Sequence, residues 1–227
     1  MSEDDCYSIE GVVAIAMKLI IGNRNYSSWS LRAWLAVRIA DAECDVLRVP
    51  LYGPESRSTL ARLSPTGKVP VLETDHGVIW DSLAISEYLA ERFPDSRLWP
   101  EDAGSRAIAR SVCAEMHSGF GALRTALPMD MRRAERRTID NEAVQADIDR
   151  IHGLWAYCRE NYGKSGNYLF GQPTLADAFF APIASRFRSY CVELPDVARG
   201  YVETIHGWPA FSEWRQLALA EKELFET

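Results

Sequence analysis

The sequence has no pair of cysteines in a C-x-x-C pattern, although it contains five cysteines. They are dispersed along the chain as Cys6, Cys44, Cys113, Cys158 and Cys191. An odd number of dispersed cysteines argues against both a disulfide scaffold and a zinc ribbon. We therefore interpret them as small buried hydrophobic residues of a cytoplasmic protein, where the environment is reducing.

Histidine pairs at metal-ligand spacing and an excess of positive charge are also lacking. The four histidines are His76, His117, His152 and His206, and no two have the spacing of a zinc site. The formal net charge is −7, whereas nonspecific nucleic-acid binding needs a basic face. We expect no metal and no nucleic-acid partner. The basic run at 132–137 is interpreted as a solvated loop between helices or a helix end.

Long hydrophobic runs are absent as well, so no stretch has the length needed to cross a bilayer. Residues 1–5 are acidic, unlike the basic start of a secretory signal. We expect no membrane partner. Residues 12–16 are expected to precede or extend the first strand, and the order of residues 1–15 does not follow from the sequence.

The first third of the chain alternates between strand and helix patterns. We expect strands at 17–21 and 45–49, helices at 28–40 and 83–93, a loop at 52–56, and a hairpin of strands 68–73 and 78–80. Two strands joined through a helix form a parallel pair, and the hairpin adds an antiparallel pair. The pattern predicts a mixed sheet with helices on its faces.

The pattern changes after Phe93-Pro94, and no convincing strand follows Gly104. Amphipathic stretches lie at 104–126, 138–161, 174–190 and 208–224. We therefore predict an α/β domain at 17–97 and an all-α domain at 104–227. A chain of 227 residues can bury a core of this kind without disulfides or metals.

The first segment with possible chemistry runs from Tyr26 to Arg32, where the first strand gives way to the first helix. A serine here can simply cap the helix. The helix start also presents free N–H groups and partial positive charge, and a serine hydroxyl can donate to a thiolate. The spacing of Ser27 and Ser30 resembles C-x-x-C with oxygen in place of sulfur. Because serine forms no mixed disulfide, thiol–disulfide exchange is disfavoured. We assign Ser27 to the thiolate and Ser28 to the cap.

Two further segments follow in the same domain. Pro70 opens a strand, where proline has no N–H for the ladder. A cis bond before it would turn the Val69 backbone toward a ligand, although trans is the commoner isomer in general. Asp81 and Ser82 precede the next helix. Ser82 is a candidate N-cap, and the pair also suits an amino-acid head group, with Asp81 on the ammonium and Ser82 on the carboxylate.

Each segment alone is weak evidence for a function. Together and in this order, the segments resemble those of cytosolic glutathione transferases over residues 18–220. The matching pieces are Ser-Ser-Trp-Ser-Leu-Arg, Pro-Thr-Gly-Lys-Val-Pro-Val-Leu, Asp-Ser-Leu-Ala-Ile-Ser-Glu-Tyr-Leu and Gly-Gln-Pro-Thr-Leu-Ala-Asp. The likeness is greatest to the serine-type branch that includes the zeta class, whose motif is Ser-Ser-Cys-x-x-Arg. Trp29 stands in place of that cysteine, and Arg32 stays in register.

The resemblance implies a thioredoxin-like β-α-β-α-β-β-α domain that binds glutathione and a helical domain that lines the electrophile pocket. It implies that Ser27, or alternatively Ser28, activates the glutathione thiol. It further implies a cis Val69–Pro70 bond with Val69 on the cysteinyl unit, Asp81 and Ser82 on the γ-glutamyl end, and Lys68 near the glycine carboxylate. Family members are usually two-fold dimers, so a homodimer is expected.

Asp177, His117 and Trp29 could each have either a functional or a structural role. Thr174 and Asp177 have the spacing of a capping box, so we interpret Asp177 as structural and not as a catalytic acid. His117 lies on the first long helix of the second domain, where it either packs or borders the substrate. Trp29 follows the serines and is a candidate contact to the electrophile, whereas Met116, Phe120 and Trp208 are expected in the core.

One hydroxyl and a helix start suffice energetically for thiol activation. Lowering a thiol pKa from about 8.5 to about 6.5 requires about 2.7 kcal/mol of preferential thiolate stabilisation, and a charged hydrogen bond contributes about 1.5–3 kcal/mol. Three functions remain open: conjugation of glutathione to small electrophiles with a role in detoxification, which we favour; isomerisation of the maleylacetoacetate type; and glutathione binding without catalysis. Conjugation, isomerisation and peroxide reduction are not separated by the sequence, nor is the electrophile identified.

Overall fold

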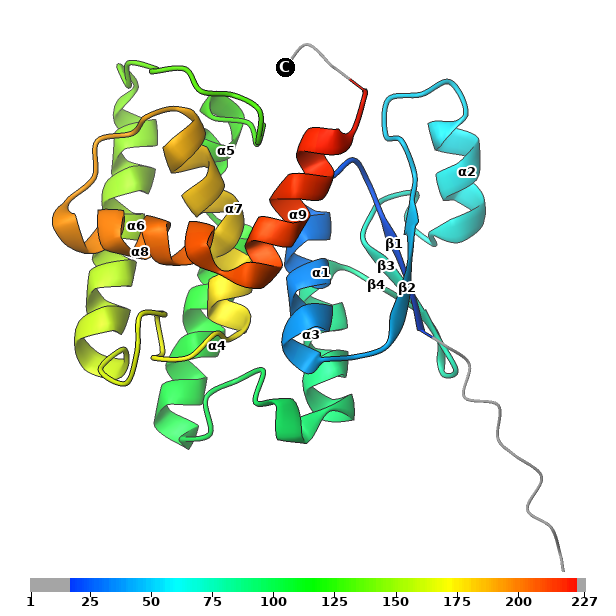
Figure 1. The fold of residues 1–227 in the computed structure, drawn as a ribbon, viewed down its shortest axis with the longest axis horizontal. Helices are drawn as coiled ribbons and strands as arrows, with labels where there is room; N and C mark the ends of the chain where they lie inside the picture. Colours follow the sequence, from blue (N-terminus) through cyan, green and yellow to red (C-terminus); the bar gives the residue numbers. More distant parts are fainter. Residues whose placement is uncertain (1–16, 224–227) are drawn as a thin grey trace, which may run out of the picture.

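The computed structural model describes residues 17–223, so the expectation for residues 12–16 lies outside the described part, as does Cys6. Figure 1 shows a four-stranded sheet next to a group of helices. The first part contains β1 (Met17–Ile21), α1 (Ser28–Ala40), β2 (Cys44–Arg48), α2 (Ser56–Leu63), β3 (Val71–Thr74), β4 (Gly77–Trp80), α3 (Ser82–Arg92) and a short 3-10 helix (Pro94–Ser96). The second contains α4 (Ala103–Ser118), α5 (Gly121–Ala126), α6 (Glu142–Tyr162), α7 (Leu175–Ser189), α8 (Asp196–Gly207) and α9 (Pro209–Ala220).

The sheet is mixed, as predicted, with strand order β2-β1-β3-β4. β1 pairs parallel with β2 and antiparallel with β3, and the β3–β4 hairpin is antiparallel. Leu19 and Ile21 of β1 face the core shared with α1, whereas Ile20 packs with Leu60 of α2 on the other face. Helices α1 and α3 therefore cover one face and α2 the other (Figure 1), which is the predicted thioredoxin-like arrangement followed by an all-helical part.

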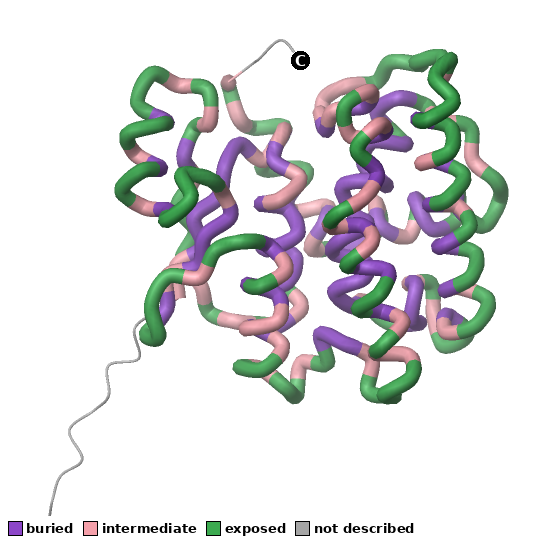
Figure 2. Tube along the Cα trace, turned by 180° about the vertical axis from the view of Figure 1, so that it is seen from behind, coloured by how far each residue is buried: buried purple, intermediate pink, exposed green. Residues whose placement is uncertain are grey.

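Helix α7 is the centre of the helical part and also its contact with the sheet domain. Every residue of α7 is buried except Arg188, and the helix packs against α1, α4 and α8. Figure 2 shows buried residues concentrated in the interior and exposed residues around it. Trp155 of α6 is fully buried and makes edge contacts with Phe180, Phe187 and Tyr201. Its truncation to alanine is expected to cost about 3–5 kcal/mol.

The predicted capping box at the start of α7 is confirmed. Asp177 Oδ2 accepts a hydrogen bond from the Thr174 N–H at 2.8 Å. Its Oδ1 accepts from the Leu169 N–H at 3.1 Å and from the Tyr201 hydroxyl at 3.0 Å. Burial raises the pKa of Asp177 to about 6, and these hydrogen bonds oppose that rise. All its oxygens point to structural partners, so Asp177 holds the fold as expected.

Several element boundaries differ from the sequence predictions. Helix α2 was implied by the family resemblance but not by the residue pattern, because only Ser56 and Leu60 of its eight residues are buried and its apolar stripe is thin. Helix α8 was also missed, although Ala198, Tyr201, Val202 and Ile205 have helical spacing. Strand β3 begins at Val71 and not at residue 68.

The expected helix at 104–126 is two helices. It is interrupted at Gly119 and Phe120, where Phe120 has a φ of 60°. That left-handed backbone cannot continue an α-helix. Met116, Phe120 and Trp208 are buried, as predicted. No helix among residues 17–223 is long and apolar enough to cross a membrane.

Two interpretations of polar and sulfur-containing residues need correction. Cys113 and Cys158 are buried, but Cys44 is half-buried and Cys191 is exposed, because β2 is an edge strand and Cys191 follows the end of α7. The basic run at 132–137 lies between α5 and α6, as expected. It is not merely solvated, since the Arg132 guanidinium donates to the carbonyls of Ala218 and Glu221 at the end of α9.

Candidate functional site

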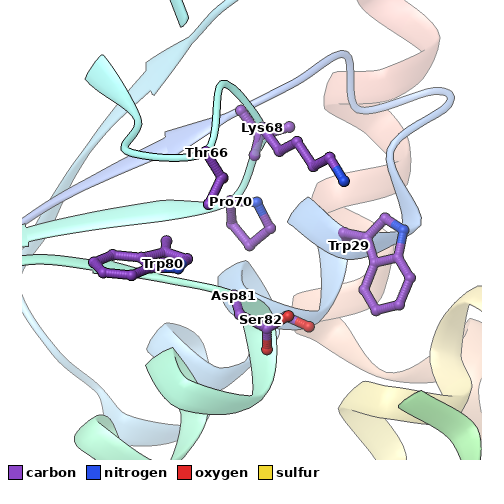
Figure 3. A pocket seen from close by; sticks show the side chains of 8 residues that line it. Trp29, Thr66, Lys68, Pro70, Trp80, Asp81 and Ser82 are labelled. Carbon is purple, nitrogen blue, oxygen red and sulfur yellow. The ribbon is translucent and has the colours of Figure 1, made fainter. Parts of the chain in front are cut away.

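The three segments singled out in the sequence meet around one cavity of about 390 Å³. Trp29, Lys68, Val69, Pro70, Asp81 and Ser82 line it, and Thr66 and Trp80 complete the lining. Figure 3 shows Trp29 and Trp80 at opposite sides, with Pro70, Asp81 and Ser82 between them. The cavity thus joins the start of α1, the loop before β3 and the junction between β4 and α3.

The loop before β3 offers an unpaired stretch of backbone to this cavity. Ser64 Oγ accepts from the Lys68 N–H at 3.1 Å, and Gly67 turns the chain with a φ of 66°. The Val69–Pro70 bond is cis, as the resemblance implied. Among residues 17–223, no backbone hydrogen bond involves Val69. Its N–H and C=O are therefore available to an extended peptide, in the manner of an added strand.

The junction between β4 and α3 places two polar groups at a helix start. Asp81 is the N-cap, and its Oδ1 accepts from the Leu83 N–H at 2.7 Å. The expectation that Ser82 caps α3 is therefore wrong, since Ser82 is the first helical residue. Asp81 has a φ of 75°, a conformation that costs a non-glycine residue about 1–3 kcal/mol. The Ser82 hydroxyl is fully buried and has no hydrogen-bond partner among the described residues.

His117 of α4 connects the helical part to this junction. Its Nε2 lies 3.4 Å from Asp81 Oδ2, and its ring makes an edge contact with Trp29 at 5.1 Å between centroids. His117 is not among the residues that line the cavity. Burial lowers the pKa of His117, the charges of Arg32 and Arg124 lower it further, and Asp81 raises it. The imidazole is consequently neutral near pH 7, and it contacts both Asp81 and Trp29.

The start of α1 differs from the prediction by one residue. Ser27 is the N-cap, whereas Ser28 had been assigned that role. Ser27 Oγ accepts from the Ser30 N–H at 3.3 Å and donates to Ser30 Oγ at 2.8 Å. Ser28 Oγ instead accepts from Nη2 of Arg186, a residue of α7, at 3.0 Å. Neither Ser27 nor Ser28 lines the cavity itself; the next residue, Trp29, does.

Three arginines surround this helix start, and the sequence analysis did not assign them to the site. The guanidinium of Arg32 lies 4.5 Å and that of Arg124 5.4 Å from the Trp29 ring centre. Arg32 is 1% exposed, and its Nε and Nη1 form no hydrogen bond with the part of the chain that the structure describes. Burial and the charges of Arg186 and Arg124 lower the pKa of Arg32 to about 9. The sequence did hold a signal for this role, because Arg32 lies between the apolar residues Leu31 and Ala33. An arginine is almost never fully buried unless it is paired.

The site therefore suits a ligand with three different parts. The unpartnered Ser82 hydroxyl and the N–H groups of α3 fit a carboxylate, and Asp81 fits an ammonium group. The Val69 backbone fits an extended peptide in the middle. The start of α1, with its hydroxyls and positive surroundings, fits an atom that carries negative charge. Among the described residues, no group of three or more His, Cys, Asp or Glu side chains could hold a metal ion.

Two family models match the chain. The model described as glutathione S-transferase, N-terminal domain covers residues 26–92, and the one described as glutathione S-transferase, C-terminal domain covers residues 141–217. The chain is similar to a probable maleylacetoacetate isomerase of Caenorhabditis elegans. The two are 32% identical over 193 residues, which is 83% of this chain and 87% of the relative.

Solved structures show the same fold. One is the holo structure of a maleyl pyruvate isomerase, a bacterial glutathione S-transferase of the zeta class. It has a TM-score of 0.69 and 25% identity, and the alignment covers 91% of this chain and 99% of that one. Another is a Burkholderia glutathione transferase homologue with bound glutathione. It has a TM-score of 0.69 and 23% identity, with 91% and 100% of the two chains covered.

Proposed function

The chain belongs to the glutathione S-transferase family, and we propose that its cavity binds glutathione and activates the thiol for attack on small electrophiles. Glutathione supplies the nucleophile, its cysteinyl sulfur in the thiolate form. The chain supplies the positions of the ligand's two ends and the stabilisation of that thiolate. Among residues 17–223, no cysteine lines the cavity.

The observation that carries this proposal is the buried, unpartnered Ser82 hydroxyl beside Asp81. An unsatisfied buried polar group costs about 1–3 kcal/mol, so a partner that satisfies it is favoured. The γ-glutamyl end of glutathione carries a carboxylate and an ammonium on one carbon. Ser82 would receive the carboxylate and Asp81 the ammonium, which uses both groups at once.

The remaining contacts follow along an extended tripeptide. The Val69 backbone would pair with the cysteinyl unit, because both of its hydrogen-bonding groups are unused among the described residues. Lys68 lines the same cavity and would lie near the glycine carboxylate. The sulfur would then lie at the start of α1, where Ser27 and Ser28 present the hydroxyl candidates. Trp29 and His117 would border the electrophile from the helical side.

A second candidate activity is cis–trans isomerisation of the maleylacetoacetate type. The similarity to relatives named maleylacetoacetate isomerases favours it. Both activities need the same activated thiolate. They differ in outcome, because conjugation consumes glutathione whereas isomerisation returns it.

Calorimetry and a substrate panel test this proposal together. We expect glutathione to bind at millimolar concentration or tighter, and binding to weaken when Asp81 is changed to Asn. Chlorodinitrobenzene conjugation, peroxide reduction and maleylacetone isomerisation would then be measured side by side, with glutathione consumption followed in each. Absence of glutathione binding would contradict the proposed function, and isomerisation without consumption would select the second candidate.

We further propose a cytoplasmic location with a role in detoxification, and a two-fold homodimer in solution. Support for the dimer comes from the family resemblance and from Val78 and Trp80, two large side chains of β4 that are exposed in the single chain. Light scattering should give twice the mass of the 25.6 kDa chain. A monomer mass that does not change with concentration would contradict this expectation.

A further inference from the structure

The loop between β1 and α1 (residues 22–27) is bonded to the far end of the chain. We propose that Glu221, which follows α9, is a positioning residue of the site. It holds this loop so that Trp29 stays at the wall of the cavity, on the side where the electrophile would bind. The inference rests on the proposed function and adds a residue that is not among those lining the cavity.

Both backbone polar groups of Arg24 in this loop pair with the helical part. Its N–H donates to Glu221 Oε1 at 2.9 Å, and its carbonyl accepts from Trp214 Nε1 of α9 at 3.0 Å. The next N–H along the chain, that of Asn25, donates to Glu221 Oε2 at 3.4 Å. Hydrogen bonds to a carboxylate are about twice as strong as neutral ones. One side chain therefore fixes two successive residues of the loop.

Glu221 is itself held in place by basic side chains. Its side chain is only 5% exposed, and its Oε1 lies 3.6 Å from Arg24 Nη1 and 3.8 Å from Arg48 Nε. The Arg132 guanidinium donates to the Glu221 carbonyl and to that of Ala218. A carboxylate buried to this degree is costly unless it is paired. These contacts therefore fix both the charge and the backbone of Glu221.

The same loop has a second anchor in the helical part. The Asn25 side chain is fully buried, and its Nδ2 donates to Asp130 Oδ1 at 2.8 Å. Its Oδ1 accepts from the Met131 N–H at 3.0 Å. The loop is thus held by residues 130–131 on one side and by Trp214 and Glu221 on the other. Its position is set by the helical part and not by the sheet alone.

Trp29 depends on this loop because it is the second residue of α1. The first N–H groups of a helix have no partner within the helix, so the position of the first turn follows that of the chain before it. Trp29 lines the cavity at the side opposite Trp80 (Figure 3). A displacement of about 1 Å caused far from the reacting atoms can lower a rate about 100-fold. Asp81 and Ser82 lie on a different segment, at the start of α3.

Two ligands with the same peptide separate these two sides of the cavity. S-methylglutathione makes the peptide contacts alone, whereas S-(2,4-dinitrophenyl)glutathione also carries a ring that would reach Trp29. Calorimetry would measure both affinities for wild type, Glu221→Ala and Glu221→Gln. We expect Glu221→Ala to weaken the dinitrophenyl conjugate about threefold to tenfold, the value of one aromatic contact. Its affinity for S-methylglutathione should change less than about twofold. Glu221→Gln keeps an acceptor for the Arg24 N–H and should fall between wild type and Glu221→Ala.

Glu213→Ala is the matched control. Glu213 also belongs to α9 and also pairs with α1, but its exposed ion pair is with Arg38 in the last turn of that helix. Its removal should leave the ratio of the two affinities unchanged. A carboxylate with a merely structural role would lower the melting temperature without changing this ratio.

A double variant tests whether Glu221 acts through Trp29. In Trp29→Ala the addition of Glu221→Ala should not change the ratio further, because the contact it positions is already gone. If Glu221→Ala does not fold, Trp214→Phe takes its place. That change removes the bond to the Arg24 carbonyl, keeps an aromatic ring, and should move the ratio in the same direction.

The inference and the proposed function fail in different ways. An unchanged ratio in the folded variant, equal weakening of both ligands, or an additive effect in the double variant would overturn the positioning role of Glu221. Failure of the wild-type chain to bind S-methylglutathione would instead contradict the proposed function.

Discussion

The starts of α1 and α3 border the same cavity, yet they are built for opposite purposes. The start of α3 has a partly exposed carboxylate, Asp81, and the unpartnered hydroxyl of Ser82. The start of α1 has no acidic residue in its first turn, a cap that is already satisfied, and buried arginines nearby. One helix start can therefore receive a zwitterionic head group, and the other can stabilise an isolated negative charge.

The comparison shows that a helix N-terminus does not by itself define a ligand. Both helices present the same free N–H groups and partial positive charge. The side chains around them decide what binds. Asp81 adds a negative charge that an ammonium group can balance, whereas Arg186 and Arg32 add positive charge that favours a thiolate.

The largest effect is expected from changing the head-group end. Asp81→Asn removes the charge that faces the ammonium and should weaken glutathione binding about 10–100-fold. Asparagine is as good an N-cap as aspartate, so the melting temperature should stay close to wild type. Calorimetry measures the affinity, and Asp75→Asn in the exposed β3–β4 turn is the matched control. An unchanged affinity would show that Asp81 does not hold the head group.

Ser82→Ala separates the contribution of the Ser82 hydroxyl to glutathione affinity from its contribution to the free energy of unfolding. The Ser82 hydroxyl has no hydrogen-bond partner within residues 17–223, so its removal loses no hydrogen bond there and should leave the free energy of unfolding unchanged or higher. Glutathione affinity should fall about threefold to tenfold, the value of one hydrogen bond. Thermal unfolding with and without glutathione measures both quantities. A loss of stability without ligand would mean that the hydroxyl serves the fold.

The pH dependence of binding should depend on His117. Burial lowers the pKa of His117 below the usual histidine value of 6.5. The ring therefore takes up a proton only at a lower pH than an exposed histidine does. The resulting imidazolium would pair with Asp81 and compete with the ligand's ammonium, so affinity should fall as the pH falls through the lowered pKa. His117→Gln should flatten this dependence.

S-methylglutathione is the suitable ligand for that measurement, because it carries no thiol that titrates. His76→Gln is the control, since His76 is exposed in the β3–β4 turn. Equal pH profiles for wild type and His117→Gln would remove His117 from the head-group site.

The smallest effect is expected at the cap of α1. Ser27→Ala should lower the free energy of unfolding by about 1 kcal/mol, since it removes an N-cap. Chemical denaturation measures it, with Ser111→Ala, an exposed mid-helix serine of α4, as the control. A change in glutathione affinity larger than the change in stability would break the separation between capping and catalysis at this helix start.

The sequence was sufficient for the parts of the site that lie on short segments. The mixed sheet and the helical second part were predicted from residue patterns. The cis bond before Pro70 and the grouping of Lys68, Val69, Asp81 and Ser82 were implied by the family resemblance. Local patterns report local structure, so individual strands and helices could be predicted from short runs of residues.

The features that were not predicted depend either on the exact residue at which a helix begins or on contacts between residues far apart in the sequence. Ser27 and not Ser28 caps α1, a difference of one residue that helix propensity does not resolve. Arg186 meets Ser28 only because α7 packs against α1. At the end of α7, Arg186 and Arg188 give the same sequence signal, cations near a helix C-terminus, although one is buried and the other exposed.

A crystal structure of the chain with bound glutathione tests the central claim most directly. The account predicts the γ-glutamyl carboxylate on the Ser82 hydroxyl, the ammonium on Asp81, and the sulfur at the start of α1, within hydrogen-bond distance of the Ser27 or Ser28 hydroxyl. Glutathione bound away from the starts of α1 and α3 would contradict the account.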